Sequence, residues 1–211
     1  MSKNQWLVGV TAITMFASGC QPATPTSTTT TPKATPESAA ESKVAAKDPK
    51  QIAATAKDEM FKTLSAKLLE AMSQGGPAVA IEVCSKDAPK IADRIGKQFD
   101  VQIGRTSFKL RNSKNTPPDW VKPIVEDKPT EPRFVDLPVN HTGALFPIML
   151  KVQCLACHGP KEQISPDVQA QLDRLYPEDQ ATGFNEGDLR GWFWVDVPTP
   201  KLEMTSETPS K

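Results

Sequence analysis

Two cysteines and a histidine, in the order C-L-A-C-H at positions 154 to 158, are the residues of this sequence best suited to chemistry. Thiols three positions apart on a helical turn point the same way, so each can add to one vinyl group of a haem. The adjacent His158 can then place its imidazole on the iron as the proximal ligand. The motif therefore predicts one covalent haem c, held by Cys154, Cys157 and His158.

Two other interpretations fit the C-x-x-C spacing less well. A redox dithiol of the thioredoxin type belongs in a βαβ context, which this sequence does not show. A zinc site needs four convergent ligands, and neighbouring residues such as Cys157 and His158 seldom bind one tetrahedral ion together. Covalent haem is therefore the interpretation that the motif favours.

Cys20 and Cys84 are the two cysteines that lie outside the C-x-x-C-H motif. The chain has four cysteines, so Cys84 has no partner for an intramolecular disulfide if Cys154 and Cys157 hold haem and Cys20 carries lipid. Cys84 lies on the apolar side of a predicted helix, where a free thiol is commonly a core residue. The other interpretation is that its thiolate binds the iron opposite His158.

Other candidates for that second iron position are few. His141 is the only other histidine, and a vacant position open to a small gas is a further alternative. Met149 is too close in sequence to the motif, while Met60 and Met72 are expected in a helix core. The residues alone leave these alternatives open.

The first twenty residues have the organisation of an export signal. Lys3 gives a positive start, an apolar core runs from Trp6 to Phe16, and small residues precede Cys20. About eleven apolar residues are too few for a permanent span, which needs roughly 20. The ending resembles a bacterial lipobox, although Ala17 stands where Leu is usual. We expect a signal peptide over 1–19, a lipidated Cys20 and an exported protein anchored in the periplasm or cell envelope.

Composition divides the rest of the chain. Residues 20–50, rich in Thr, Pro and Ala, cannot bury enough apolar surface to fold and are expected to form a flexible tether. The folded domain is expected over 51–198, with a flexible tail over 199–211. The 25 basic and 25 acidic residues balance, which argues against a nucleic-acid partner.

Hydrophobic periodicity predicts a long helix at the start of the domain. Apolar residues from Ile52 to Met72 recur every four positions, and Gly75, Gly76 and Pro77 should end the helix. A second helix is expected from Ala78, with Pro89 breaking or kinking it and Asp87 capping its second half.

The remaining segments predict a small antiparallel sheet. The expected elements are a strand over 101–111, a loop over 112–119, a short helix over 119–126, strands over 133–140 and 144–152 separated by a turn at 141–143, a helix over 166–175, a loop with Gly183 and Gly187, and a last strand over 189–197. Helices packed mainly on one face of such strands make an α+β domain.

Four blocks of sequence resemble the PAS-like single-haem c-type domain of cyanobacterial cytochromes and of some bacterial extracytoplasmic sensors. They are AIEVCSKDAPKIA (80–92), RTSFKLRNSKNTPPDW (105–120), PIMLKVQCLACHG (147–159) and LYPEDQATGFNEGDLRGWFWV (175–195). The resemblance implies a PAS-like antiparallel sheet with flanking helices. It also implies that His158 and Cys84, in its V-C-S block, bind the iron.

Other polar and aromatic residues have weaker claims on the site. Arg105 and Arg111 could pair with haem propionates, because guanidinium matches carboxylate geometry, or could form ordinary ion pairs. Asn112 is expected to fix its loop backbone. Trp120, Trp192 and Trp194 could wall a haem pocket, although core packing is the favoured role.

These features favour redox sensing or single-electron transfer without substrate turnover, together with a redox or signalling partner protein. One alternative is a small peroxidase-like haem enzyme with a vacant distal site and His141 as its acid–base group. Another is a structural lipoprotein that haem merely stabilises. The favoured interpretation is not an enzyme.

Overall fold

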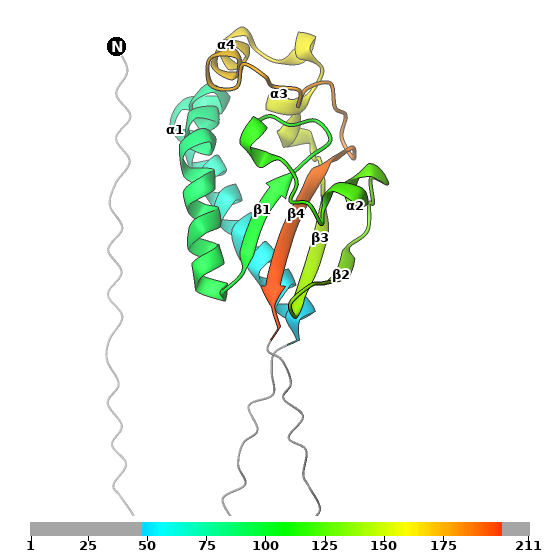
Figure 1. The fold of residues 1–211 in the computed structure, drawn as a ribbon. Coiled ribbons are helices and arrows are strands. Elements are labelled where there is room, and N and C mark those ends of the chain that lie inside the picture. Colours follow the sequence, from blue (N-terminus) through cyan, green and yellow to red (C-terminus); the bar gives the residue numbers. More distant parts are fainter. Residues whose placement is uncertain (1–47, 200–211) are drawn as a thin grey trace, which may run out of the picture. The chain divides into compact units, whose positions relative to one another are not determined.

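A four-stranded antiparallel sheet is the centre of the domain, in the order β1-β4-β3-β2 (Figure 1). The computed structural model describes residues 48–199. The expected export signal, Cys20 and the tether lie outside these residues, as does the expected tail beyond Thr199. The elements are α1 (Pro49–Phe99), β1 (Gln102–Thr106), η1 (Ser113–Asn115), α2 (Lys122–Glu126), β2 (Arg133–Leu137), β3 (His141–Met149), η2 (Val152–Cys154), α3 (Leu155–His158), η3 (Lys161–Gln163), α4 (Pro166–Leu175) and β4 (Leu189–Pro198). The α+β fold, with an antiparallel sheet and a long N-terminal helix, is confirmed.

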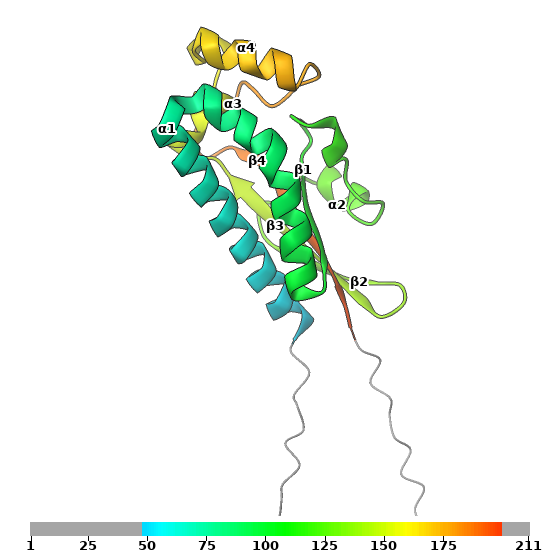
Figure 2. The same ribbon diagram turned by 90° about the vertical axis from the view of Figure 1, so that its left-hand side faces the viewer.

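The side chains of strand β4 point alternately to the two faces of the sheet, as they do on any strand. Phe193, Val195 and Val197 face α1 and form a core with Ala144 and Phe146 of the neighbouring strand β3. Trp192 and Trp194 face the other way, toward α2. Figure 2 shows α1 and α2 on opposite sides of the sheet.

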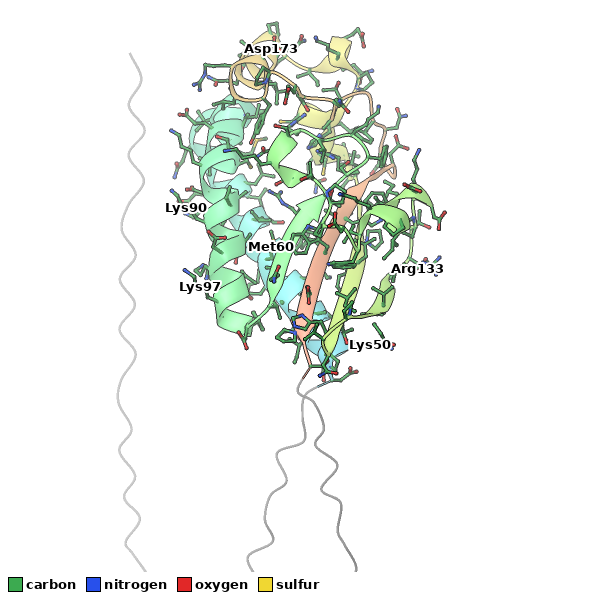
Figure 3. The ribbon with its side chains drawn as sticks, viewed as in Figure 1. Lys50, Met60, Lys90, Lys97, Arg133 and Asp173 are labelled. Carbon is green, nitrogen blue, oxygen red and sulfur yellow. The ribbon has the colours of Figure 1, made fainter. Side chains whose placement is uncertain are left out.

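Helix α1 consists of two arms that meet at Gly75 and Gly76, the two residues in it with non-helical dihedral angles. Gly76 has a φ of 73°, which glycine adopts without steric cost. Met60 of the first arm and Ile95 of the second lie in the same core against the sheet (Figure 3). The predicted stop at these glycines is confirmed as a sharp bend between two helical arms.

The prediction that Pro89 breaks the second arm is wrong, as is the assignment of Asp87 as a cap. The dihedral angles are helical through Pro89, and Asp87 instead lies within the helix beside Lys90. A proline removes one backbone hydrogen bond from a helix. Ala88, Ile91 and Ile95 are buried against the rest of the domain, and this packing holds the helix on both sides of the proline.

Two predicted strand boundaries are also wrong. Strand β1 ends at Thr106, because the Ser107 hydroxyl accepts from the Lys109 N–H at 3.0 Å and turns the chain away. Strand β3 begins at His141, where a turn was expected. The chain turns earlier, with positive φ at Val139 and Asn140.

The aromatic residues on the α2 face form a second core. Trp192 is fully buried beside Val121 and Leu145, and its indole N–H donates to the Pro129 carbonyl at 2.8 Å. Trp120 and Trp194 pack against the same cluster. The favoured core role of these tryptophans is therefore confirmed.

At the other end of the sheet, α4 covers the bend of α1. Val168 and Leu172 pack on Ile81, and Cys157 joins this cluster from the C-x-x-C-H segment. The helix spans the predicted residues 166–175. Within the part of the chain that the structure describes, no helix has the length and apolar character needed to span a bilayer.

Candidate functional site

The C-x-x-C-H segment lies at the end of the sheet where β3 finishes, beside α4 and the bend of α1 (Figure 1). A 3-10 turn ends at Cys154 and continues into the single helical turn Leu155–His158. Cys154 and Cys157 therefore lie three positions apart on continuous helical backbone, and both thiols are half-buried. This is the local structure that the motif predicts.

His158 is held through one ring nitrogen. Its Nδ1 lies 2.7 Å from the Ala181 carbonyl oxygen, so Nδ1 carries the proton and donates it. Burial, together with the positive charges of Arg111 and Arg190, places the pKa of His158 well below its ordinary value. The ring is consequently neutral, and the lone pair on Nε2 is available to a metal.

The loop between α4 and β4 fixes the backbone of the motif. The Gly183 N–H donates to the Gly159 carbonyl at 2.8 Å, and the Phe184 N–H donates to the His158 carbonyl at 3.0 Å. The ring of Phe184 also lies edge-on to that of His158. The orientation of His158 is thus set by both its backbone and its side chain.

Arg111 connects three parts of the site. Its Nε lies 3.2 Å from both carboxylate oxygens of Asp179. Its terminal nitrogen donates to the carbonyl oxygens of Cys157 and Ala181. Only 13 % of the Arg111 side chain and 9 % of the Asp179 side chain are exposed. The predicted candidate Arg111 is therefore held beside the motif by an almost buried ion pair.

Arg190 approaches His158 from β4. It donates to the Ser107 hydroxyl at 2.8 Å and to the Lys109 carbonyl at 3.0 Å, while its Nε lies 3.3 Å from Nδ1 of His158. Because Nδ1 donates to Ala181, this last approach brings two N–H groups together and adds positive charge beside the ring. Burial and the charge of Arg111 lower the pKa of Arg190 to about 10, so the guanidinium stays charged at neutral pH.

Cys84 lies on the second arm of α1, half-buried. Ile81, one helical turn earlier, packs in the cluster that Cys157 joins. Burial raises the pKa of the Cys84 thiol, while the positive charges of Arg105 and Arg111 act in the opposite direction. The structure therefore brings Cys84 to the same end of the domain as the motif.

Arg105 lies close enough to Cys84 for its positive charge to lower the pKa of that thiol. Ile103 packs with Ile91 and Ile95 of α1, and Arg105 is on the same face of β1, about 6.6 Å further along. The second arm runs antiparallel to β1, so this step corresponds to about four residues back along the helix from Ile91 and Ile95, in the direction of Cys84 but short of it. Among the described residues no carboxylate pairs with Arg105, and removal from water lowers its pKa.

The remaining candidates lie elsewhere. His141 begins β3, a strand of nine residues that ends at the motif side, so it is about 26 Å away along the strand. Its Nδ1 pairs with Asp196 at 2.6 Å. Met60 is buried in the helix core, as expected, and Met149 is exposed on β3. The Asn112 side chain accepts from the Lys114 N–H at 3.0 Å, which confirms its expected role in the loop.

Sequence reasoning missed Asp179, Ala181 and Arg190. All three belong to the 175–195 block, where the charged residues of LYPEDQ and DLR give no sign of their partners. Ala181 acts through its backbone carbonyl and has no side-chain signature. Across residues 48–199, no three His, Cys, Asp or Glu side chains are grouped as ligands of a free metal ion.

Comparison with known proteins connects the whole domain to one family. Residues 28–198 match the sequence model of the Tll0287-like family. The fold is similar to the crystal structure of the cyanobacterial haem protein Tll0287, with a TM-score of 0.52 and 24 % sequence identity over 70 % of this chain and 92 % of that one. No curated protein matches the chain.

Proposed function

Since this chain belongs to the Tll0287-like family, we propose that it is an exported haem protein with one covalently attached haem c. Cys154 and Cys157 provide the thioether bonds and His158 the proximal iron ligand. The observation that carries the proposal is the state of His158, which is neutral, held at Nδ1 by Ala181 and free at Nε2. A histidine ligand fixed in this way through its second nitrogen is the usual arrangement at metal sites.

The charges around the motif support the same cofactor. Arg105, Arg111 and Arg190 contribute three positive charges, and Asp179 contributes one negative charge, which leaves a difference of +2. Half-buried cations without enough counter-charge are costly unless an anion accompanies them. A haem brings two propionates, which would balance the difference. Arg105, which no described carboxylate pairs, is the strongest candidate to bind one of them.

Cys84 is proposed as the distal iron ligand. It lies on the second arm of α1, at the motif end of the sheet, within electrostatic range of Arg105 and Cys157. Burial raises the pKa of the Cys84 thiol, and the nearby guanidinium groups of Arg105 and Arg111 oppose that rise. Bound between a thiolate and an imidazole, haem iron would be six-coordinate and stabilised in the ferric state, which gives a low potential.

A centre of this kind suits redox sensing or single-electron transfer rather than substrate turnover. The peroxidase-like alternative relied on His141 as an acid–base group, and His141 lies at the opposite end of β3. The proposal includes export to the periplasm or cell envelope, a lipid anchor at Cys20, and a redox or signalling protein as partner.

The test is to express the full chain in a bacterium that attaches c-type haem and to record its mass and its EPR spectrum. We expect one haem bound per chain after denaturation, and none bound covalently in the Cys154→Ser/Cys157→Ser variant. We also expect a low-spin ferric thiolate signal that Cys84→Ala abolishes. Ser85→Ala, on the same helical turn, is the matched control and should keep the signal.

Two outcomes would count against the proposal in different ways. Wild-type protein that loses all haem on denaturation would contradict covalent attachment. An EPR signal identical in wild type and Cys84→Ala would exclude Cys84 as the ligand while leaving the attachment intact.

A further inference from the structure

The carbonyl oxygen of Ala181 accepts two hydrogen bonds, one from Nδ1 of His158 at 2.7 Å and one from Arg111 at 3.1 Å. We propose that Arg111, anchored by Asp179, is a positioning residue that limits the hydrogen bond from His158 to Ala181 and so sets how strongly the imidazole donates to iron. This inference rests on the proposed function, because it concerns the proximal ligand of the haem.

The arrangement is fixed from several sides. Asp179 holds Arg111 through two oxygens at 3.2 Å, and the same carboxylate accepts the Ala181 N–H at 2.8 Å. One acidic side chain therefore positions both the guanidinium and the peptide whose carbonyl it approaches. Arg111 also donates to the Cys157 carbonyl, next to His158 in the chain. Since the ion pair is almost buried, water does not substitute for these contacts.

The effect on His158 follows from how one acceptor is shared. A carbonyl oxygen has two lone pairs, and each N–H that it accepts draws electron density from it. A charged donor draws more than a neutral one, because charge-assisted hydrogen bonds are the stronger kind. With Arg111 present, Ala181 is a weaker acceptor for His158. The imidazole then has less anionic character and donates less charge to the iron.

Arg190 has a different part in the same environment. It is held by Ser107 and by the Lys109 carbonyl, and it makes no hydrogen bond to Ala181. Its charge acts on His158 through space, whereas Arg111 acts through the shared acceptor. Arg111 also carries a charge that acts through space. A substitution that keeps this charge but loses the hydrogen bond to Ala181 can therefore separate the effect of the charge from the effect of the shared acceptor.

The experiment measures the midpoint potential of the haem-loaded protein and the NMR shift of the His158 Nδ1 proton in the diamagnetic ferrous, carbon monoxide-bound form. In Arg111→Gln we expect the ferric form to be favoured about tenfold, or about 59 mV for one electron, and the Nδ1 proton to move downfield. In Arg111→Lys the charge is kept, but the guanidinium N–H groups that bond Asp179 and Ala181 at the same time are lost. There we expect a smaller change in potential, with the proton still moved downfield.

Arg133→Gln is the matched control, since it removes the same charge from the exposed edge strand β2 (Figure 3). It should leave both measurements at wild-type values. Asp179→Asn, which has the shape of the native residue, tests the anchor: the Nδ1 proton should move downfield as in Arg111→Gln, while the loss of a negative charge opposes the change in potential. It also replaces Arg111→Gln if that variant fails to retain haem.

The outcomes separate this inference from the proposed function. Wild-type chain without covalent haem overturns the proposed function. A haem-loaded wild type whose potential and Nδ1 proton are matched by the Arg111 and Asp179 variants overturns the inference alone. A potential restored fully by Arg111→Lys, with no proton shift in any variant, would show that only the charge of Arg111 matters and would also overturn it.

Discussion

The two histidines of this chain lie near opposite ends of the sheet and are held in contrasting ways. His158 donates to a neutral backbone carbonyl in a half-buried setting with arginines nearby. His141 pairs with the carboxylate of Asp196, and its side chain is 33 % exposed beside an open hollow of about 560 Å³. At the motif end, the ring of His158 is therefore oriented by a neutral group, which places no negative charge against it. At the other end, the ring of His141 is held by a carboxylate, in a pair close to solvent.

This difference indicates what each end contributes. A neutral acceptor keeps an imidazole in the form that binds metals, while the surrounding cations leave room for an anionic cofactor. An ion pair near the surface contributes little to stability. Four variants, two at each end, test whether the two ends differ in this way.

The largest effect is expected at the histidines themselves. His158→Ala removes the proximal ligand of the proposed haem, so the low-spin absorption spectrum should be lost. His141→Ala should keep the wild-type spectrum, because the residue is about 26 Å away along β3. Absorption spectra of both variants in the ferric state decide this. A spectrum altered by His141→Ala and kept by His158→Ala would reverse the assignment.

A large loss of stability is expected from Asp179→Ala at the motif end. The change leaves Arg111 almost buried without its counter-charge, and breaking a buried pair in this way costs about 3 kcal/mol. The free energy of unfolding, measured by denaturant titration and circular dichroism, should fall by about that amount with an unchanged slope. A loss below about 1 kcal/mol would mean that Asp179 is not the main partner of Arg111.

The smallest effect is expected from Asp196→Ala at the other end. The Asp196 side chain is 15 % exposed and its partner His141 is more so, and pairs near the surface contribute about 0–1 kcal/mol. The same denaturant titration should therefore show a loss within about 1 kcal/mol. A loss as large as that of Asp179→Ala would remove the contrast between the two ends.

The features predicted from sequence depend on local patterns. The four-residue stripe of the first arm of α1, the stop at Gly75 and Gly76, and the helix over 166–175 all follow from neighbouring residues. The C-x-x-C-H segment also forms its helical turn from local sequence. In each case, the residues that determine the structure are within a few positions of one another.

The features that were missed depend on distant or unfavourable contacts. Arg111 and Asp179 are 68 residues apart, and either could have formed an ordinary surface pair. The turn before β3 uses a positive φ at Val139, a conformation that a β-branched residue disfavours, so its sequence gives no turn signal. Pro89 remains helical because tertiary packing outweighs one lost hydrogen bond.

Both ends of the described chain lie on the side of the sheet away from the motif. Thr199 donates to the Asn140 carbonyl at 2.7 Å, and Lys50, at the start of α1, lies near Phe134 of β2 (Figure 3). The first arm of α1 then extends about 39 Å to the bend near the C-x-x-C-H segment. A chain held by either terminus would therefore present the C-x-x-C-H segment at the far tip of the domain, away from the point of attachment.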